Sequence, residues 1–398
     1  MKKVLATILA LVMAIGLCSV SWATGSTLPT AENGVIKLTE NVTLTERWEV
    51  AANTEITLDL NGYSITSAGQ VIMNNGKLTI TDNKGGGKIV STGSQAIGVG
   101  SNSVTNIQKA IVESVEGAVI TGRAIGAIIN IYDGTFSASD NAVIAGNGSD
   151  REGTGNTINI SGGVFNGKIT TPGYVACGIY APWKDNINVT GGTFNITGGA
   201  GIVARAGNVT VTNAVFNTTG NATGKVGDSR VVVPCSAIVF DSQANYPAMN
   251  NDSVIHVVSG KFNSEMNAVS MIKNDNETDR VAVTGGTFST DVKEYLAEGK
   301  ILQKNGDTYT AVTNSGITSG TYTAKPTVPD GYKVVENTDG TFTVEKVGGY
   351  YYYQPTTDTK TTDTKGSPKT FDAGIALYVG MALTSAAGVA FVGKKRED

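Results

Sequence analysis

A short pattern recurs along the middle of the chain and constrains the fold more than any other feature. It begins with Ile or Val, has a second β-branched residue two positions later, and closes on Phe seven positions after the start. Glycine, or once alanine, stands two residues before the Phe. The six copies end at Phe136, Phe165, Phe194, Phe216, Phe262 and Phe288. Such self-similarity predicts a repeat architecture, in which each copy is one structural unit.

The pattern has a direct physical interpretation. Apolar residues at alternate positions face one side of a strand, so Ile129 and Ile131, and their equivalents, face an interior. Glycine allows a sharp bend, after which the Phe returns to the same interior. Successive Phe residues lie 22 to 46 positions apart. A unit of this size predicts one turn of a coil, not a separate domain.

A second, weaker pattern follows most of the Phe residues. It reads small, small, aliphatic and predicts another strand in the segments that start at Asn141, Cys177, Ala200, Ser236 and Asn267. Two or three strands per coil, stacked in register, give an all-β, right-handed parallel β-helix, a single-stranded solenoid. We expect its coils from about Val35 to Ser289, within a domain of residues 24–290. The alternative is a β-sandwich of hairpins, which needs antiparallel neighbours.

Residues 291–347 predict a cap and a small β module. Asp291 and Glu294 form a possible capping box, and Gly299 suits a helix end, so a short helix is expected to cover the last coil. Two hairpins are expected next, over 301–312 and 332–347. Residues 348–370 are rich in Thr, Asp and Lys, which is typical of a flexible stalk.

The N-terminus has the three parts of a secretory signal. Lys2 and Lys3 precede an apolar run, and small residues stand at the positions before a cut between Ala23 and Thr24. We therefore expect residues 1–23 to be removed and the rest to be secreted. Cys18 leaves open a lipoprotein signal, although the residue before it is not small.

Residues 371–398 predict a membrane tail. Positions 373–393 carry no charge and are long enough to cross a bilayer, and Lys394, Lys395 and Arg396 follow at once. A buried core helix is the alternative. Just upstream, Ser367, Pro368, Lys369 and Thr370, followed by Phe371, resemble the Leu-Pro-x-Thr-Gly sorting signal of Gram-positive surface proteins. Only the Pro and Thr match. The resemblance implies sortase as a partner and attachment to peptidoglycan, whereas an uncut tail would hold the protein in the membrane.

The central repeats resemble a broad class as well. The stretch that starts at Leu58 and the Gly-Gly-Thr-Phe repeats that start at Gly191 and Gly285 are similar to pectate-lyase-like β-helix surface proteins of anaerobic Gram-positive bacteria. The resemblance covers most of residues 35–300. It implies a fold and a place at the cell surface, but not one activity, because this fold carries lyases, hydrolases, adhesins and passive stalks.

Composition narrows the function. A net charge of −4 argues against nucleic acid as a partner. His256 is flanked by Ile255 and Val257, so it is expected to point outward without a catalytic role. No metal-ligand cluster and no cofactor motif is found in the sequence. Cys177 and Cys235 are expected about two coils apart, too far for a disulfide, and to serve as buried apolar residues.

Loops on one side of the coil are the best candidate for binding. Trp183 follows a proline beside charged residues, which is typical of a platform on which sugars stack. The candidate residues are Trp183, Tyr180, Asp185, Arg205, Asp241 and Tyr246. The alternative is that Trp183 folds over the edge of the coil.

Three functional hypotheses follow. The first is a surface-anchored, adhesin-like β-helix that contacts glycans or host matrix and is not an enzyme. The second is a polysaccharide lyase or glycoside hydrolase, which would need stacked carboxylates that the sequence does not show. The third is a passive stalk or coat.

Overall fold

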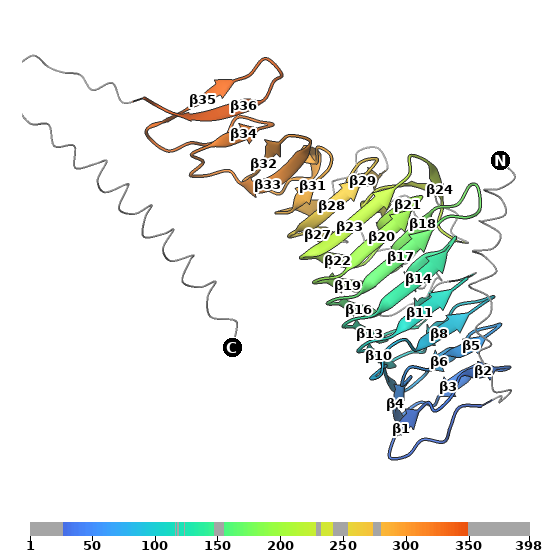
Figure 1. Cartoon of the computed structure of the whole chain (residues 1–398). Helices are drawn as coiled ribbons and strands as arrows, with labels where there is room; N and C mark the ends of the chain where they lie inside the picture. The colour runs from blue at the N-terminus through green and yellow to red at the C-terminus, as the bar shows by residue number, and fades with distance from the viewer. Residues whose placement is uncertain are drawn as a thin grey trace, which may run out of the picture. The chain divides into compact units, whose positions relative to one another are not determined.

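The computed structural model describes residues 27–348, except 116, 118, 123, 147–154, 228–231, 242–253 and 274–279. These residues form a parallel β-solenoid, in which strands from successive coils lie side by side and run in the same direction (Figure 1). The predicted signal peptide, stalk, sorting signal and membrane tail lie outside the described residues. Within them, no helix has the length and apolar character needed to cross a membrane.

Each described coil except the last contributes a strand to each of three sheets, of which the first carries the paired aliphatic residues. We call it sheet I. Its strands are β1 (Val35–Lys37), β4 (Glu55–Asp59), β7 (Lys77–Thr81), β10 (Val104–Ile107), β13 (Ile128–Ile131), β16 (Thr157–Ile160), β19 (Asn186–Val189), β22 (Asn208–Val211), β27 (Ile255–Val257) and β30 (Val281–Val283).

Sheet II follows the glycine bend and carries the Phe residues. Its parallel strands are β2 (Val42–Leu44), β5 (Ile65–Ser67), β8 (Lys88–Ser91), β11 (Ile111–Ser114), β14 (Thr135–Ser139), β17 (Val164–Lys168), β20 (Thr193–Thr197), β23 (Ala214–Thr219), β28 (Gly260–Ser264) and β31 (Thr287–Phe288).

Sheet III contains the second sequence pattern. Its strands are β3 (Trp48–Val50), β6 (Ile72–Asn74), β9 (Ile97–Val99), β12 (Ile120–Gly122), β15 (Ala142–Gly146), β18 (Ala176–Ala181), β21 (Gly199–Ala204), β26 (Ile238–Asp241) and β29 (Val269–Ile272). A separate antiparallel hairpin, β24 (Thr223–Lys225) and β25 (Val232–Pro234), lies between β23 and β26 in the chain.

The observed register confirms the alignment of the repeats. Ile129 pairs with Ile158, which pairs with Ile187, and the Phe residues pair in the same order. Between successive coils the pairing is parallel in all three sheets, which rules out the β-sandwich. The first coil begins at Val35 and the last ends at Phe288, as expected. The right-handed sense of the coil and the domain boundaries stay predictions.

The bend between sheets I and II requires glycine. Gly163 and Gly192 have φ of 99° and 96°, a left-handed region that other residues rarely adopt. A Cβ atom on the neighbouring Gly191 would lie 2.3 Å from the carbonyl oxygen of Ser161 in the coil below. The glycine pair therefore permits both the turn and the close stacking of successive coils.

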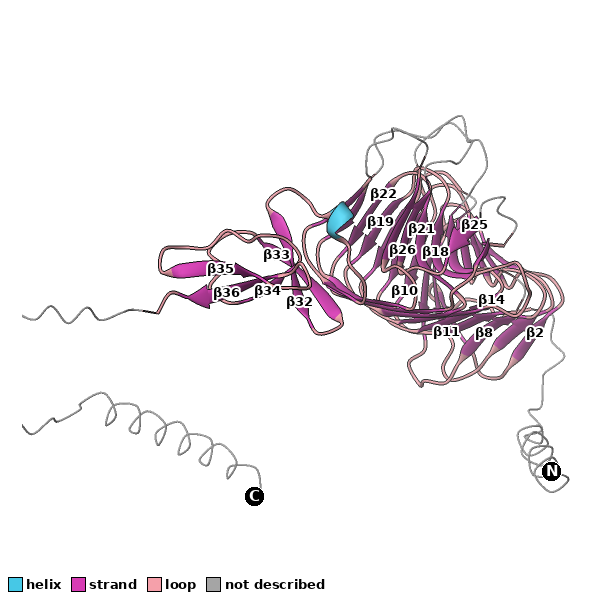
Figure 2. Ribbon diagram, turned by 90° about the horizontal axis from the view of Figure 1, so that it is seen from above, coloured by secondary structure: helices cyan, strands magenta, loops and turns pink. Residues whose placement is uncertain are grey.

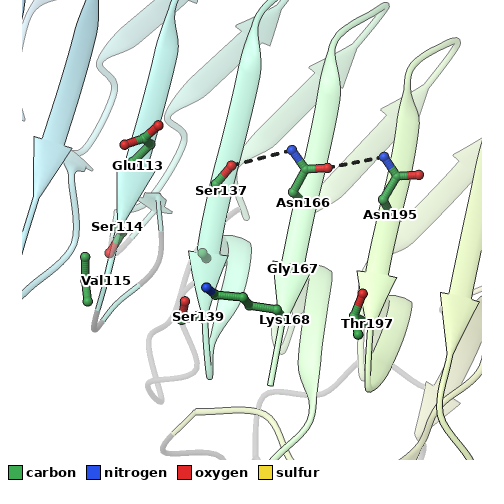
Figure 3. A pocket seen from close by; sticks show the side chains of 11 residues that line it. Glu113, Ser114, Val115, Ser137, Ser139, Asn166, Gly167, Lys168, Asn195 and Thr197 are labelled. Carbon is green, nitrogen blue, oxygen red and sulfur yellow. Dashed lines mark hydrogen bonds between the residues drawn. The ribbon is translucent and has the colours of Figure 1, made fainter. Parts of the chain in front are cut away.

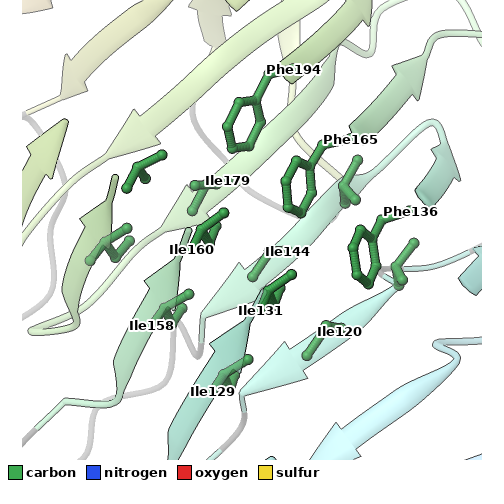
Figure 4. Close-up of a cluster of buried hydrophobic side chains, with 14 of the residues drawn as sticks. Ile120, Ile129, Ile131, Phe136, Ile144, Ile158, Ile160, Phe165, Ile179 and Phe194 are labelled. Atoms are coloured by element: carbon green, nitrogen blue, oxygen red, sulfur yellow. The ribbon is translucent and has the colours of Figure 1, made fainter. Parts of the chain in front are cut away.

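The core consists of columns of like side chains, drawn in Figure 4. The six Phe rings are buried and stack nearly parallel, with centroids of neighbouring rings 4.5 to 5.5 Å apart. Columns of buried Ile and Val from sheets I and III face them. Each such side chain contributes roughly 1.5–3 kcal/mol through burial, so stability accumulates coil by coil.

One register in sheet III differs from the expected alignment. We aligned Val143 with Ile179, but Ile144 is its partner, and Ala142 instead of Asn141 lies beside Cys177. The shift places Ile144 in one column with Ile120 and Ile179. Both Val143 and Ile144 are buried, so apolar character alone could not decide which of them joins that column.

The cap after the last coil is smaller than expected. A single turn of 3-10 helix, η1 (Lys293–Tyr295), replaces the predicted helix, and its N-cap is Val292, without a capping side chain. The predicted capping box is therefore wrong. Asp291 accepts one hydrogen bond from the Lys293 N–H, and Leu296 bridges to Val283 at the end of sheet I. The turn is drawn in cyan beside the last coil in Figure 2.

The two predicted hairpins are confirmed and extend sheet II. They are β32 (Lys300–Asn305) with β33 (Thr308–Thr313), and β35 (Tyr332–Glu336) with β36 (Phe342–Lys346). A further strand, β34 (Gly320–Tyr322), joins the hairpins, and β33 pairs antiparallel with β31. The module thus continues sheet II of the solenoid, and the edge of this sheet at β31 is covered by a hydrogen-bonded strand.

We predict that Phe194→Ala destabilises the protein by about 3–5 kcal/mol, because it opens a cavity between two stacked rings in a core that other coils hold in place. The free energy of unfolding, measured by urea denaturation, tests this. Thr193→Ala on the outer face is the control and should change the free energy by less than about 0.5 kcal/mol. Equal effects of the two variants would contradict the stacked core.

Candidate functional site

The outer face of sheet II carries a row of hydrogen-bonded polar side chains. We call it the sheet II ladder, and it consists of Ser137, Asn166, Asn195, Asn217 and Asn263. Each Asn donates an Nδ2–H to the preceding member, over 3.5, 3.2, 2.9 and 2.9 Å in chain order. The ladder exists because each residue directly follows a core Phe, and neighbours on a strand face opposite sides.

A shallow groove of about 440 Å³ lies over the N-terminal half of this ladder (Figure 3). Strands β11, β14, β17 and β20 form its floor. It is lined by Glu113, Ser114, Val115, Ser137, Ala138, Ser139, Asn166, Gly167, Lys168, Asn195 and Thr197. Neutral hydroxyl and amide groups dominate the polar part of this surface.

Two charges belong to the lining. The Glu113 carboxylate lies 3.0 Å from the Lys88 ammonium on the neighbouring strand β8. Lys168 extends along the groove from β17 toward β14 in Figure 3. Among the described lining residues, Glu113 is the only acid, so the groove lacks the carboxylate pair that glycoside hydrolysis usually uses.

Sheet I carries a comparable row, which we call the sheet I ladder. It consists of Thr79, Asn106, Asn130, Asn159 and Asn188, joined by hydrogen bonds of 3.4, 2.8, 2.9 and 2.9 Å. His256 lies farther along the same row, exposed as predicted, between Thr210 and Ala282. None of the described residues of this ladder lines the groove over sheet II. Variants in the sheet I ladder can therefore serve as controls for variants in the sheet II ladder.

Most of the residues that the sequence analysis predicted for binding are buried in the structure. Trp183 is 1 % exposed, so the prediction of an open stacking platform is wrong. Only residues 182–185 connect β18 to β19, and this short connection folds the indole over the edge of the coil. Asp185 lies beside it in the same connection, its backbone N–H bonded to the Trp183 carbonyl. Tyr246 lies outside the described residues.

Three further candidates are brought together, and two of them are buried. Arg205 Nε lies 3.0 Å from Asp241 Oδ2, with side chains 5 % and 0 % exposed, and Arg205 Nη1 donates to the Tyr180 hydroxyl over 3.2 Å. Tyr180 itself is partly exposed. Breaking a buried pair of this kind typically costs about 3–5 kcal/mol, because one charge is left without compensation. The cluster therefore joins successive coils, through Tyr180 on β18, Arg205 after β21 and Asp241 on β26.

Asp185 is a buried carboxyl with an unusual environment. Its Oδ1 accepts the Asn156 N–H over 2.8 Å, whereas Oδ2 has no hydrogen-bond partner among the described residues. Gly146 packs so closely that a Cβ atom there would lie 2.1 Å from Oδ2. Burial raises the pKa of Asp185 from 3.8 to about 6, and the Asn156 hydrogen bonds oppose this only in part.

Both cysteines are free and buried, which agrees with their predicted role as small apolar residues. They belong to a second apolar cluster in which the outer face of sheet III meets the β24–β25 hairpin. Burial raises the pKa of both thiols, which keeps them protonated and unreactive. Within the described part of the chain, no group of three or more His, Cys, Asp or Glu side chains could hold a metal ion.

The sequence contains a signal for the polar row that lines the groove. Asn follows Phe at four of the six repeats, at Asn166, Asn195, Asn217 and Asn263. On a strand whose Phe faces inward, this position must face outward. A column of Asn could therefore have been predicted on sheet II, although not the concave shape above it.

Comparisons of the chain with family models, with curated proteins and with solved structures found no match. The structure itself supports one part of the resemblance to pectate-lyase-like proteins, the parallel β-solenoid.

We predict that Asp185→Asn changes the pH dependence of stability. A carboxyl whose pKa is higher in the folded state stabilises the protein below pH 4, and this contribution is lost as pH rises through about 6. The loss corresponds to about 2 kcal/mol between pH 4 and pH 7. Urea denaturation at several pH values should show this decline for the natural protein and a smaller decline for the variant. Parallel curves would mean that Asp185 does not titrate in this range.

Proposed function

We propose that the protein is a non-enzymatic β-helix held at the cell surface, which binds an extended polyhydroxylated polymer along the outer face of sheet II. The groove over the sheet II ladder is the observation that carries this proposal. The secretory signal and apolar tail in the sequence support location at the surface, in the membrane or joined to peptidoglycan by a sortase.

The polar groups of the groove suit a glycan. Sugar hydroxyls both donate and accept hydrogen bonds, and so do the Asn amides and the Ser and Thr hydroxyls that line it. These groups recur with the strand spacing of about 4.8 Å, so a polymer can repeat the same contacts on successive coils.

The lining argues for binding over catalysis. Glu113 is bonded to Lys88, and the described lining offers no second acid to act as nucleophile or to activate water. A lyase or hydrolase activity of the pectate-lyase-like class is therefore the less favoured proposal.

A glycan array probed with the whole chain tests this function. We predict that the double variant Asn166→Ala/Asn195→Ala binds its best glycan about tenfold more weakly, because each lost hydrogen bond is worth roughly 0.5–1.5 kcal/mol. The matched control is Asn159→Ala/Asn188→Ala, which removes two rungs of the sheet I ladder and should leave binding unchanged.

Three other results would count against the proposal. Absence of binding to any glycan would favour a passive stalk or coat. Equal losses in the two double variants would place the ligand elsewhere. Release of shorter or unsaturated oligosaccharides from a bound polymer would overturn the assignment as a non-enzyme.

A further inference from the structure

The sheet II ladder has unused hydrogen-bonding capacity of a definite kind. An Asn amide has two N–H donors and two acceptor lone pairs on its oxygen. In the ladder, Asn166 and Asn195 each donate one N–H to the preceding rung and accept one from the next. Each of these partly exposed amides therefore keeps one N–H and one lone pair for a ligand.

This combination selects for hydroxyl groups over carboxylates. A hydroxyl can accept from the free N–H and donate to the free lone pair, so it satisfies both. An ionised carboxylate only accepts, and it would leave the amide oxygen facing another oxygen. An unsatisfied polar group in a contact costs more than a hydrogen bond contributes, so an acidic polymer would lose affinity at every Asn that meets a carboxylate in place of a hydroxyl.

The charges around the groove do not reverse this preference. Glu113 is paired with Lys88, so together with Lys168 these groups leave a single net positive charge at the described lining. Recognition of a polyanion would instead need several cations along the path. Beyond the groove, the ladder continues through Asn217 on β23 to Asn263 on β28, again with neutral amides.

The direction of the ladder fixes the direction of the ligand. Its rungs lie on five neighbouring strands, β14, β17, β20, β23 and β28. At the strand spacing, the ladder covers about 19 Å along the solenoid axis and across the strands. A polymer ligand that crosses the strands meets a new amide at each coil, whereas a ligand that lies parallel to one strand meets a single Asn.

We infer, on the basis of the proposed function, that the ligand is a neutral polysaccharide that lies along the solenoid axis and is read by the outward amides of successive coils. Three consequences follow. Affinity increases with the length of the oligosaccharide until the ladder is filled, uronic acid chains of equal length bind less tightly, and the binding of neutral chains is insensitive to salt.

The experiment uses the whole chain, with cello-oligosaccharides of increasing length and oligogalacturonates of the same lengths, followed by isothermal titration calorimetry at low and high salt. We expect the neutral series to bind at least tenfold more tightly than the acidic series at equal length. If the acidic series binds more tightly and the sheet II double variant weakens it, the neutral ligand is excluded while the proposed function stands. If neither series binds and no other glycan does, both fail.

A second variant tests the orientation. Asn217→Tyr blocks the ladder just beyond the groove, so it should leave short oligosaccharides unaffected and remove the gain in affinity with length. The matched control is Thr210→Tyr, on the neighbouring strand β22 of sheet I, which should preserve that gain. A length dependence that survives Asn217→Tyr would overturn the axial orientation, and circular dichroism of both variants would show whether the fold is retained.

Discussion

The whole structure depends on coils that stack in register, so that each inward side chain meets its own kind in the coils on either side. The Phe column shows this most clearly, with rings nearly parallel at stacking distance along six coils. A slip of one residue would turn every Phe outward and every Asn inward. The register is therefore fixed by the difference in free energy between burying an aromatic ring and burying an amide.

The same constraint shapes the exterior. Once inward positions repeat, outward positions must repeat as well, and a favoured outward residue becomes a column. Asn suits such a column because its amide donates to one neighbour and accepts from the other, as in the sheet I and sheet II ladders. The outward side chains thus repeat once per coil because the core repeats. A polymer of repeating units is a natural ligand for such a surface.

The coils could be predicted from the sequence because they repeat. Features that depart from the repeat could not. Ile129, Phe136 and their equivalents could be placed because six copies support one another. Trp183 could not, because it occurs once, in a short connection, and exposed and buried positions are equally consistent with its neighbours in sequence. The structure buries it, and burial of a large apolar surface outweighs the cost of an indole N–H without a partner among the described residues. The one-residue error at Ile144 has the same origin, since two adjacent buried aliphatics leave the phase of a strand undetermined.

The rungs of the sheet II ladder all donate the same way, from each Asn toward the coil before it. The amide dipoles consequently add, and the two ends of the row are chemically different: Ser137 ends it as an acceptor hydroxyl, and Asn263 ends it with a carbonyl oxygen that no later rung of the ladder engages. A sugar chain has distinct ends too, one reducing and one not. A polar row of this kind gives a bound sugar chain a preferred direction. Every bound ligand would then have its reducing end toward the same end of the solenoid.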